Sequence, residues 1–467
     1  MMASTGSATE LAVTTTPIPG MLVLTLPMPG DNRGWFKENW QREKMLKLGL
    51  PDFGPVQNNM SFNTAKGATR GLHAEPWDKY VSLATGRIMG AWVDLREGDS
   101  FGAKLSIEMG PETAVFVPRG VANGYQALED GTAYTYLVND HWSPEARSQY
   151  TYLNLADETA AIAWPIPLDQ AEISDADKKH PRLADVTPMK PARTVVIGAK
   201  GQLGQSLMEL LSEASGLTRE ELDVTDREAV QAFNWNGVGT IINAAAYTAV
   251  DVAETDEGRK DCWAANVHAV QNLVEVARER RIRLVHVSSD YVFDGTEQEH
   301  DEDEAFSPLG VYGQTKAAGD ALVATLPRHY VVRTSWVIGG GKNFVGIMAD
   351  LANKGVKPTV VADQYGRLTF TQDLAAGIVH LLQTDAEPGT YNLTNTGEVQ
   401  SWADIAKQVF VRCGKSADDV TPVSTQEYAA GKKISPRPTH SGLKLDKIIA
   451  AGFTPAPASQ RLDELLG

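Results

Sequence analysis

The stretch that decides the fold of the second half reads Thr194-Val195-Val196-Ile197-Gly198-Ala199-Lys200-Gly201-Gln202-Leu203-Gly204. A β-branched run leads into a glycine-rich turn and then into a helical pattern through Leu207, Leu210 and Leu211. Glycines let the backbone approach a pyrophosphate, and a helix start supplies oriented N–H groups. The pattern predicts a doubly wound α/β domain of the Rossmann type. The residues expected at its cofactor are Gly198, Gly201, Gln202, Leu203 and Gly204.

Two further strand-like runs end in small or polar residues. Thr240-Ile241-Ile242 runs into Asn243-Ala244-Ala245-Ala246, and Arg283-Leu284-Val285-His286-Val287 runs into Ser288-Ser289-Asp290. Ligands bind along the carboxyl edge of a parallel sheet. We therefore expect Ala244, Ala245 and Ala246 beside the cofactor.

Tyr312 and Lys316 are four residues apart, which is about one helical turn, so both side chains project from one face. An ammonium beside a phenol favours the phenolate and lowers a pKa that is ordinarily about 10. The tyrosine then becomes a usable general acid for a reducible carbonyl. Such a pair also occurs on exposed helices without function, so its meaning depends on the strand ends around it.

This half resembles the extended short-chain dehydrogenases, and most closely the dTDP-4-dehydrorhamnose reductases, over about residues 193–467. The matching phrases include Asn243 to Asp251, Ser289 to Gly295, Arg333-Thr334-Ser335-Trp336, Asp363-Gln364-Tyr365-Gly366 and Arg437-Pro438. The resemblance implies that Tyr312 protonates O4, that Lys316 activates it and anchors a ribose, and that Ser289 polarises the ketone. A nicotinamide would supply hydride. Substrate contacts are implied for Thr248, Asp290, Trp336 and Arg437.

The turn after the second strand selects the cofactor. A carboxylate there accepts the 2′-OH of NAD, whereas an arginine accommodates the 2′-phosphate of NADP. Thr218 and Arg219 occupy this turn in our alignment, which predicts NADPH. A shift of one residue would place Glu220 there instead, so NADH remains the alternative. Asp223 and Val224 are expected to face the adenine.

The first half contains short β-rich runs between turn signals, such as Tyr80 to Ala84, Ile88 to Asp94 and Ala114 to Pro118. This spacing predicts an all-β sandwich or barrel. Within it, Arg70-Gly71-Leu72-His73 is followed by Lys79, and the next histidine is His141. A metal site needs three or four convergent ligands, so we expect no metal.

The same half resembles the dTDP-4-dehydrorhamnose 3,5-epimerases, a metal-free, cupin-like jelly-roll family, over about residues 17–185. The matching phrases include Asp31 to Glu38, Gln57-Asn58-Asn59, Arg70 to His73, Asp94-Leu95-Arg96 and Val117 to Gly120. The resemblance implies that His73 is the base, oriented by Asp177, and that Tyr136 returns a proton from the opposite face. Lys79 would stabilise the enolate oxygen. The implied nucleotide and sugar contacts are Arg33, Glu38, Gln57, Asn59, Arg70, Arg119 and Asn123.

Two residues depart from the epimerase pattern. Asn123 stands where relatives usually carry histidine, and Glu75 stands where a glutamine is expected. Asn123 can donate a hydrogen bond but carries no charge. Neither residue is the base, the acid or the lysine, so we expect activity to survive with altered substrate affinity.

The whole chain has 467 residues and a formal net charge of −16, from 43 basic and 59 acidic residues. That balance disfavours nucleic acid as a partner. The two cysteines, Cys262 and Cys413, indicate a reducing, cytoplasmic compartment, and no apolar run approaches the length of a membrane span. We expect a homodimer through the jelly roll. The predicted divisions are a disordered tail (1–16), the jelly-roll domain (17–185), a linker (186–193) and the Rossmann domain with a small C-terminal substrate lobe (194–467).

Together the two halves predict consecutive steps: 3,5-epimerisation of dTDP-4-dehydro-6-deoxy-D-glucose, then NADPH-dependent reduction of the C4 ketone to dTDP-L-rhamnose. Two alternatives stay open. The reductase half could be a non-catalytic NADPH-binding regulatory module, or the β half could only bind a sugar nucleotide. A related deoxysugar, epimerised at one carbon, is a further alternative, because one-carbon and two-carbon epimerases share the same acid–base residues.

Overall fold

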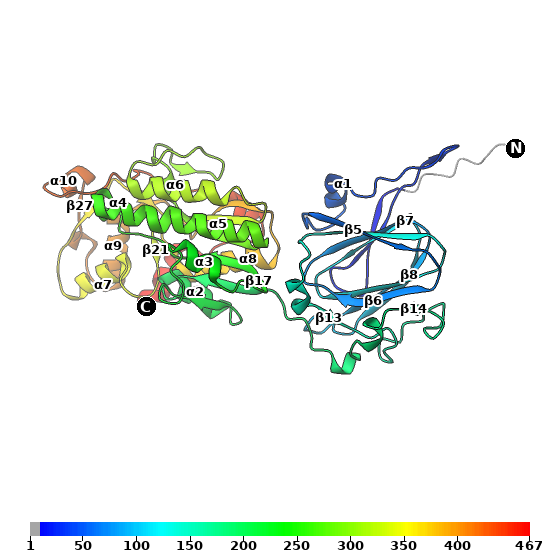
Figure 1. Cartoon of the computed structure of the whole chain (residues 1–467). Helices are drawn as coiled ribbons and strands as arrows, with labels where there is room; N and C mark the ends of the chain where they lie inside the picture. Colours follow the sequence, from blue (N-terminus) through cyan, green and yellow to red (C-terminus); the bar gives the residue numbers. More distant parts are fainter. Residues whose placement is uncertain (1–9) are drawn as a thin grey trace. The chain divides into compact units, whose positions relative to one another are not determined.

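The structure is a computed structural model that describes residues 10–467. The chain forms two compact units, and the boundary lies between Pro191 and Ala192 (Figure 1). The predicted tail is partly wrong. Its residues 1–9 lie outside the described part, but Ala12–Thr15 form strand β1, antiparallel to β2 (Leu22–Thr25). Val13, Thr14 and Thr15 are β-branched residues that favour a strand, although the Ser/Thr-rich composition suggested disorder.

The first unit is a sandwich of two antiparallel sheets, as the β-rich runs predicted (Figure 1). One sheet has the order β1-β2-β10-β7-β12-β5, and the other has the order β13-β6-β11-β8-β9, with β14 parallel to β6. The remaining bounds are β5 (Gln57–Asn63), β6 (Ala68–Ala74), β7 (Lys79–Thr85), β8 (Ile88–Asp94), β9 (Lys104–Met109), β10 (Thr113–Val117), β11 (Val121–Ala127), β12 (Thr132–Val138), β13 (Thr151–Tyr152) and β14 (Glu172–Ile173). A small hairpin of β3 (Gly30–Asp31) and β4 (Gly34–Trp35) precedes helix α1 (Arg42–Lys47).

The sandwich is filled by side chains from both sheets. Val81, Trp92 and Val115 are fully buried in its main core. Val186 and Met189, which the sequence placed in the linker, are buried in a second core of this unit. Apolar side chains there gain by leaving water, so the packed part of the jelly roll extends into the predicted linker as far as Met189.

The second unit is built on six parallel strands in the order β16-β15-β17-β18-β20-β25. Their bounds are β15 (Arg193–Ile197), β16 (Ser215–Leu217), β17 (Val238–Asn243), β18 (Arg283–Ser289), β20 (His329–Thr334) and β25 (Gly389–Asn392). The strand order reverses between β15 and β17. In such sheets this switch point opens a ligand crevice at the carboxyl ends of the strands.

Helices cover both faces of the parallel sheet. Those whose side chains pack on one face are α3 (Arg227–Ala232), α5 (Ala269–Arg280) and α6 (Val311–Val323). Those packing on the other face are α2 (Gln202–Leu210), α8 (Thr371–Gln383) and α11 (Asp446–Ala450). The doubly wound α/β architecture is confirmed.

A separate hydrophobic core identifies the C-terminal lobe of this unit. Its main elements are α7 (Phe344–Asn353), α9 (Trp402–Arg412) and α12 (Ala458–Leu466), together with the parallel pair of β22 (Thr359–Val361) and β27 (Thr421–Val423). Other short elements of the unit include α4 (Asp256–Trp263) and α10 (Thr425–Ala429). Within residues 10–467, no helix has both the length and the apolar character needed to cross a bilayer.

Candidate active sites

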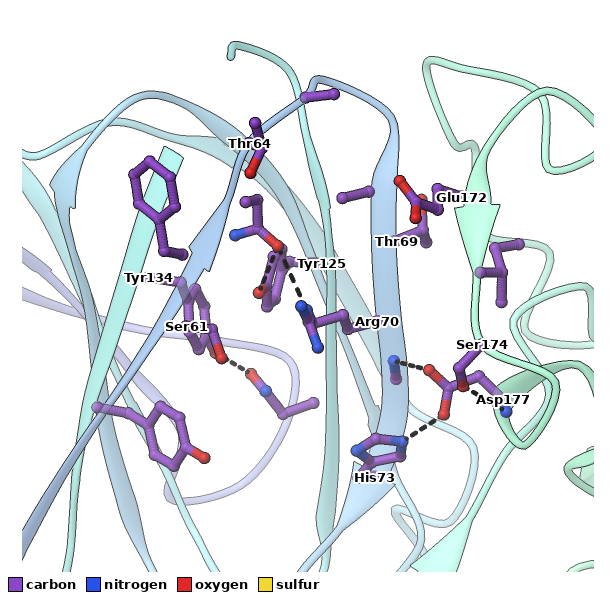
Figure 2. Close-up of a pocket in the computed structure, with 18 of the residues that line it drawn as sticks. Ser61, Thr64, Thr69, Arg70, His73, Tyr125, Tyr134, Glu172, Ser174 and Asp177 are labelled. Carbon is purple, nitrogen blue, oxygen red and sulfur yellow. Dashed lines mark hydrogen bonds and ion pairs between the residues drawn. The ribbon is translucent and has the colours of Figure 1, made fainter. Parts of the chain in front are cut away.

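The jelly roll contains a cavity of about 730 Å³, which Figure 2 shows. Strands β5, β6, β7, β11 and β12 supply its walls, and residues 172–177 close one side. Six of the residues singled out in the sequence line it together: Arg70, His73, Lys79, Asn123, Tyr136 and Asp177. The structure thus brings the implied base, acid and lysine to one place.

His73 is oriented by Asp177, as Figure 2 shows. His73 lies on β6, and its Nε2 is 2.8 Å from Asp177 Oδ1, while Asp177 Oδ2 accepts a 3.4 Å hydrogen bond from the Gly71 N–H. Burial alone would raise the pKa of Asp177. The hydrogen bond from His73 and several smaller interactions together outweigh burial, so the pKa of this carboxyl is lowered. The carboxylate therefore accepts the proton of Nε2. The Nδ1 lone pair is left free to act as a base.

A third residue, His180, completes a group that the sequence reasoning missed. Its Nε2 is 3.8 Å from Asp177 Oδ1, and its ring stacks on Tyr152 at 4.6 Å. Burial, and then the charge of His73, lowers the pKa of His180. Potential ligand atoms of His73, Asp177 and His180 lie within 4.8 Å of one another. The 2.8 Å hydrogen bond between His73 and Asp177 accounts for their close approach without a metal ion. The absence of a metal from this group stays a prediction.

Lys79 is held by Glu75, one of the two departures from the epimerase pattern. The Lys79 Nζ lies 2.8 Å from Glu75 Oε2, and both side chains are at most 10% exposed. Trp77 Nε1 donates a 2.6 Å hydrogen bond to the same oxygen. The Lys79 ammonium also lies over the ring of Tyr136, 5.5 Å from its centroid. Burial, and then the Glu75 carboxylate, raises the pKa of Tyr136 to about 12. Tyr136 therefore carries its proton at neutral pH, as a general acid must.

The second departure from the epimerase pattern, Asn123, is hydrogen-bonded to Tyr134. Asn123 Oδ1 accepts a 3.1 Å hydrogen bond from the Tyr134 hydroxyl, inside the sandwich. Arg70 Nε and the Tyr125 hydroxyl both donate to Asn63 Oδ1 at 3.3 Å. Alternation along β12 puts Tyr134 on the same face as Tyr136, which was the one signal in the sequence that could have identified it.

Five of the implied nucleotide contacts lie outside this lining: Arg33, Glu38, Gln57, Asn59 and Arg119. Arg33 is exposed and paired with Asp31, and Glu38 is paired with Lys44 at 2.8 Å. Gln57 donates to Asn59 at 2.8 Å, and Asn59 in turn hydrogen-bonds Tyr136. Their role in nucleotide binding stays a prediction.

In the second unit, the glycine-rich turn lies at the switch point of the sheet. Gly198 ends β15 with a φ of 80°, and a Cβ there would lie 2.9 Å from the backbone nitrogen of Ala245. A Cβ on Gly204 would meet Gly198 O at 2.1 Å. Both positions thus exclude a larger side chain. The residues Gly201, Gln202 and Leu203 form the start of α2 between them. The turn and the Ala244–Ala246 segment border one another, as their predicted cofactor contacts require.

The turn that selects the cofactor follows β16. Arg219 is largely exposed, and its Nε lies 3.1 Å from Asp223 Oδ2. Glu221 accepts a 2.8 Å hydrogen bond from the Thr218 backbone N–H, and Thr218 also hydrogen-bonds Glu220. Val224 packs against the core. Arg219 is thus an exposed cation that is paired with Asp223.

Ser289 ends β18, and Tyr312 and Lys316 lie at the start of α6 and one turn further along it. Ser289 hydrogen-bonds Tyr312, but burial outweighs this and raises the pKa of Tyr312 above its ordinary value. The expectation that Lys316 lowers this pKa is wrong for the structure without cofactor. Burial instead lowers the pKa of Lys316 itself to about 8, and the lysine Nζ donates to Val287 O at 2.7 Å.

A cavity of about 360 Å³ near this group is lined by residues that include Tyr291, Trp402 and Arg437. The Tyr291 ring packs edge-on against Tyr312 at 5.6 Å, which joins the cavity to the acid. Of the other implied substrate contacts, Trp336 stacks on Trp402 at 3.7 Å, whereas Thr248 is exposed and lies outside the lining.

Asp290, the remaining implied substrate contact, is buried beside Ser289. Its Oδ1 accepts a 2.9 Å hydrogen bond from the Ser289 hydroxyl. Burial raises its pKa to about 6. Asp290 therefore positions the serine. A direct contact with substrate stays a prediction.

A jelly roll with an oriented histidine base and a Rossmann domain with a serine, tyrosine and lysine at its sheet edge define a two-domain enzyme of the epimerase and reductase classes. The family model described as dTDP-4-dehydrorhamnose 3,5-epimerase matches residues 15–185, and the one described as RmlD substrate binding domain matches residues 192–466. The chain belongs to both families, one in each half.

Individual relatives agree with this division. "Protein RmlC homolog" of Streptococcus pyogenes is 51% identical over 179 residues, covering 37% of this chain and 90% of that protein. The dTDP-4-dehydrorhamnose reductase of Aggregatibacter actinomycetemcomitans is 36% identical over 294 residues, covering 59% of this chain and 98% of that protein. The crystal structure of the Bacillus anthracis dTDP-4-dehydrorhamnose reductase with NADP is 33% identical, with a TM-score of 0.54, covering 59% of this chain and 98% of that one. The chain is thus a fusion of two enzymes, and the alternatives with one inactive half are not favoured.

Proposed function

We propose that this chain converts dTDP-4-dehydro-6-deoxy-D-glucose into dTDP-L-rhamnose, by epimerisation in the jelly roll and reduction in the Rossmann unit. The observation that carries the proposal is that each unit holds a full set of acid–base groups: His73, Lys79 and Tyr136 in one cavity, and Ser289, Tyr312 and Lys316 at one sheet edge. The names of the relatives supply the substrate class.

In the epimerase step, the proton on the carbon next to the C4 ketone goes to His73 Nδ1, and the electron pair moves onto the ketone oxygen. Lys79 faces that oxygen and stabilises the enolate, which is where charge develops. Tyr136 then gives its phenolic proton to the opposite face of the same carbon. The cycle closes when water returns a proton to Tyr136 and takes one from His73. The same set acts on C3 and C5 in turn.

In the reductase step, a bound nicotinamide dinucleotide supplies hydride to C4. Tyr312 donates its proton to O4, and the Ser289 hydroxyl turns from Asp290 to donate a hydrogen bond to the same oxygen. Lys316 stabilises the phenolate that remains. The high pKa of Tyr312 keeps the proton in place until the ketone is reduced.

NADPH is the proposed cofactor. Arg219 lies in the turn after β16, and the carboxylates of Glu220 and Glu221 are occupied by Thr218. The exposed guanidinium of Arg219, released from Asp223, would match a 2′-phosphate. NADH is the alternative if Glu220 leaves Thr218 and takes the ribose hydroxyl.

We also propose a homodimer through the jelly roll, in the cytoplasm. Strand β5 lies at the edge of its sheet, and it exposes Met60 and Phe62 by 64% and 63%. The β3–β4 hairpin carries Arg33 and is followed by Phe36, which is 70% exposed. A second copy covering these apolar side chains would explain why Arg33 and Glu38 lie outside the cavity lining. Light scattering of the purified chain would test it, and a monomer at micromolar concentration would contradict it. The free cysteines Cys262 and Cys413 are in line with a reducing compartment.

The first experiment adds dTDP-4-dehydro-6-deoxy-D-glucose and NADPH to the full chain in D₂O and examines the product by NMR. Oxidation of NADPH with deuterium at both C3 and C5 of a rhamnose nucleotide is expected. Deuterium at one carbon would indicate a related deoxysugar. Wash-in without oxidation would show that the Rossmann unit does not reduce this ketone, and an absence of both signals would contradict the proposal.

A further inference from the structure

The buried end of Lys316 has a second neighbour that no sequence motif pointed to. Its Nζ lies 3.4 Å from Nε2 of His286, which is on β18 three residues before Ser289 and is 1% exposed. The lysine is itself 1% exposed. Helix α6 comes close to the imidazole at Gly319, where a Cβ would lie 3.3 Å from His286 Nε2 and 2.8 Å from Asn266 O. The glycine makes room for the ring beneath the catalytic helix.

The other nitrogen of His286 faces the amide of Asn243, at the end of β17. Asn243 Oδ1 accepts a 3.2 Å hydrogen bond from the Ala245 backbone N–H, which fixes the orientation of the amide. Asn243 Nδ2 therefore faces His286 Nδ1, at 3.2 Å. An amide nitrogen carries two hydrogens and accepts none. Nδ1 must then be the acceptor, and the single proton of the neutral ring lies on Nε2.

This tautomer has a consequence for the lysine. His286 Nε2–H points at Lys316 Nζ, and an ammonium has three donors and no acceptor. Two donors would then face one another, whereas a neutral amine has a lone pair that accepts the hydrogen bond and can still donate to Val287 O. The geometry favours the amine.

The other groups around Lys316 are few. Asp320, one turn further along α6, and Cys262, on α4, favour the charged form of the lysine. Asp320 is committed to Arg333, at 3.0 Å, and Cys262 contacts Thr315 at 3.2 Å. Burial, and then the nearby lysine, keeps the pKa of His286 well below its ordinary value, so the ring stays neutral.

We propose that Asn243 and His286 are positioning residues of the reductase site, which present an Nε2–H to Lys316 and thereby hold this lysine close to the boundary between amine and ammonium. The inference rests on the proposed reductase function and deepens it. As an amine, Lys316 leaves the proton on Tyr312. Once it has taken a proton from water, the ammonium stabilises the phenolate that remains after Tyr312 has protonated the ketone. The tautomer of His286 then decides the pH at which the reductase loses activity.

A substitution of one atom tests this. In Asn243→Asp, one carboxylate oxygen can still accept a hydrogen bond from the Ala245 N–H. The other oxygen favours the tautomer in which His286 Nδ1 carries the proton and donates a hydrogen bond to it. The ring then offers the Nε2 lone pair to the Lys316 ammonium. We expect the alkaline limb of kcat/KM for NADPH oxidation to move to higher pH by about one unit or more. An unchanged limb would overturn the proposal.

Two controls separate this effect from others. Deuterium wash-in by the jelly roll of the same chain should be unchanged, and its loss would indicate misfolding. Asn236→Asp adds the same charge at an exposed position of the Rossmann unit and should not move the limb. If the wild type and both variants fail to oxidise NADPH, the result contradicts the proposed reductase function and not the proposed tautomer of His286.

Whether the effect passes through the imidazole is tested by a double-variant cycle. In a His286→Phe background, Asn243→Asp should shift the limb by much less than in the wild type, because the ring nitrogens are gone. A full shift in that background would mean that the new carboxylate acts on the Lys316 ammonium by charge attraction alone, and it would contradict the proposal.

A readout without activity is NMR of the full chain labelled with ¹⁵N-histidine. The His286 signals are those lost in His286→Phe. A proton on Nε2, with Nδ1 unprotonated, is expected in the cofactor-free protein and should reverse in Asn243→Asp. A proton on Nδ1 in the wild type would overturn the assignment even if no variant were active.

Discussion

The two active sites of this chain are built in opposite ways. In the jelly roll, the proposed base His73 lies on β6, its partner Asp177 comes 104 residues later, and the proposed acid Tyr136 lies on a strand of the other sheet. In the Rossmann unit, Ser289 ends one strand, and Tyr312 and Lys316 lie on a single turn of the following long helix. A cavity between sheets needs residues from distant segments, whereas a sheet edge collects consecutive strand ends.

This difference decides how each site controls protons. The jelly-roll site uses charged partners: Asp177 lowers its own proton affinity by pairing with His73, and Glu75 is ion-paired with Lys79. The Rossmann site uses burial, which raises the pKa of Tyr312 and lowers that of Lys316. Burial is the first cause of the raised pKa of both tyrosines, and Glu75 adds to it in the jelly roll, so each unit retains a protonated tyrosine at neutral pH.

The largest effect is expected from His73→Ala. Loss of the base should lower deuterium wash-in by more than about 10³-fold, in line with the contribution of general bases. NADPH binding, measured by the fluorescence of the reduced nicotinamide, should stay unchanged because it belongs to the other unit. Loss of both in a folded protein would break the separation of the two sites.

Tyr312→Phe is the counterpart in the Rossmann unit. Without the phenolic proton, NADPH oxidation should fall by about 10²–10⁴-fold, while wash-in at the jelly roll proceeds at the wild-type rate. The measurement is a pair of time courses on one sample, absorbance for NADPH and NMR for deuterium. Oxidation that persists would remove Tyr312 from the role of acid.

Asp177→Asn should lower wash-in by about 10²–10³-fold. The amide nitrogen can donate to His73 Nε2, which then carries no proton and leaves the proton on Nδ1, where the base is needed. The matched control is Asp175→Asn, two residues away, where the side chain is 93% exposed. Equal loss in both variants would show that charge on this loop matters more than the histidine tautomer.

Arg219→Ala tests the cofactor preference. Removing the guanidinium should raise the KM for NADPH about tenfold, because one charge-assisted contact to the 2′-phosphate is lost. The KM for NADH should not change. An equal effect on both cofactors, in steady-state assays of NADPH and NADH oxidation, would contradict the assigned turn.

Glu75→Gln should have the smallest effect. The glutamine keeps the side-chain volume but removes the carboxylate that contributes to the raised pKa of Tyr136. A lower pKa makes the tyrosine lose its proton earlier as the pH rises, so the alkaline limb of wash-in should move down by less than about one unit. The rate at pH 7 should change by no more than a few-fold. A limb that stays in place or moves up would contradict a contribution of Glu75 to the raised pKa of Tyr136.

Several of these features could be predicted from the sequence because they are local. The turn from Gly198 to Gly204 follows from glycines that no larger residue can replace, and the Tyr312–Lys316 pair follows from helical spacing. The jelly-roll residues were reached through the resemblance, and the structure brings six of them to one cavity. Strand β1 and the buried Val186 and Met189 were missed, since composition alone does not reveal backbone pairing or packing.

The sequence by itself determined the two fold classes and the order of the units, because strand, turn and helix signals are short in range, and its family resemblances supplied the proposed acids and bases. Only the tertiary structure decided the protonation states. The line from Asn243 through His286 to Lys316 joins segments that are distant in the chain. Glu75 with Lys79 and Asp177 with His180 are close in the chain, but the folded backbone decides which side chains of these segments meet. Hydrogen-bond direction and burial set the charge of such groups, and both exist only after the chain has folded.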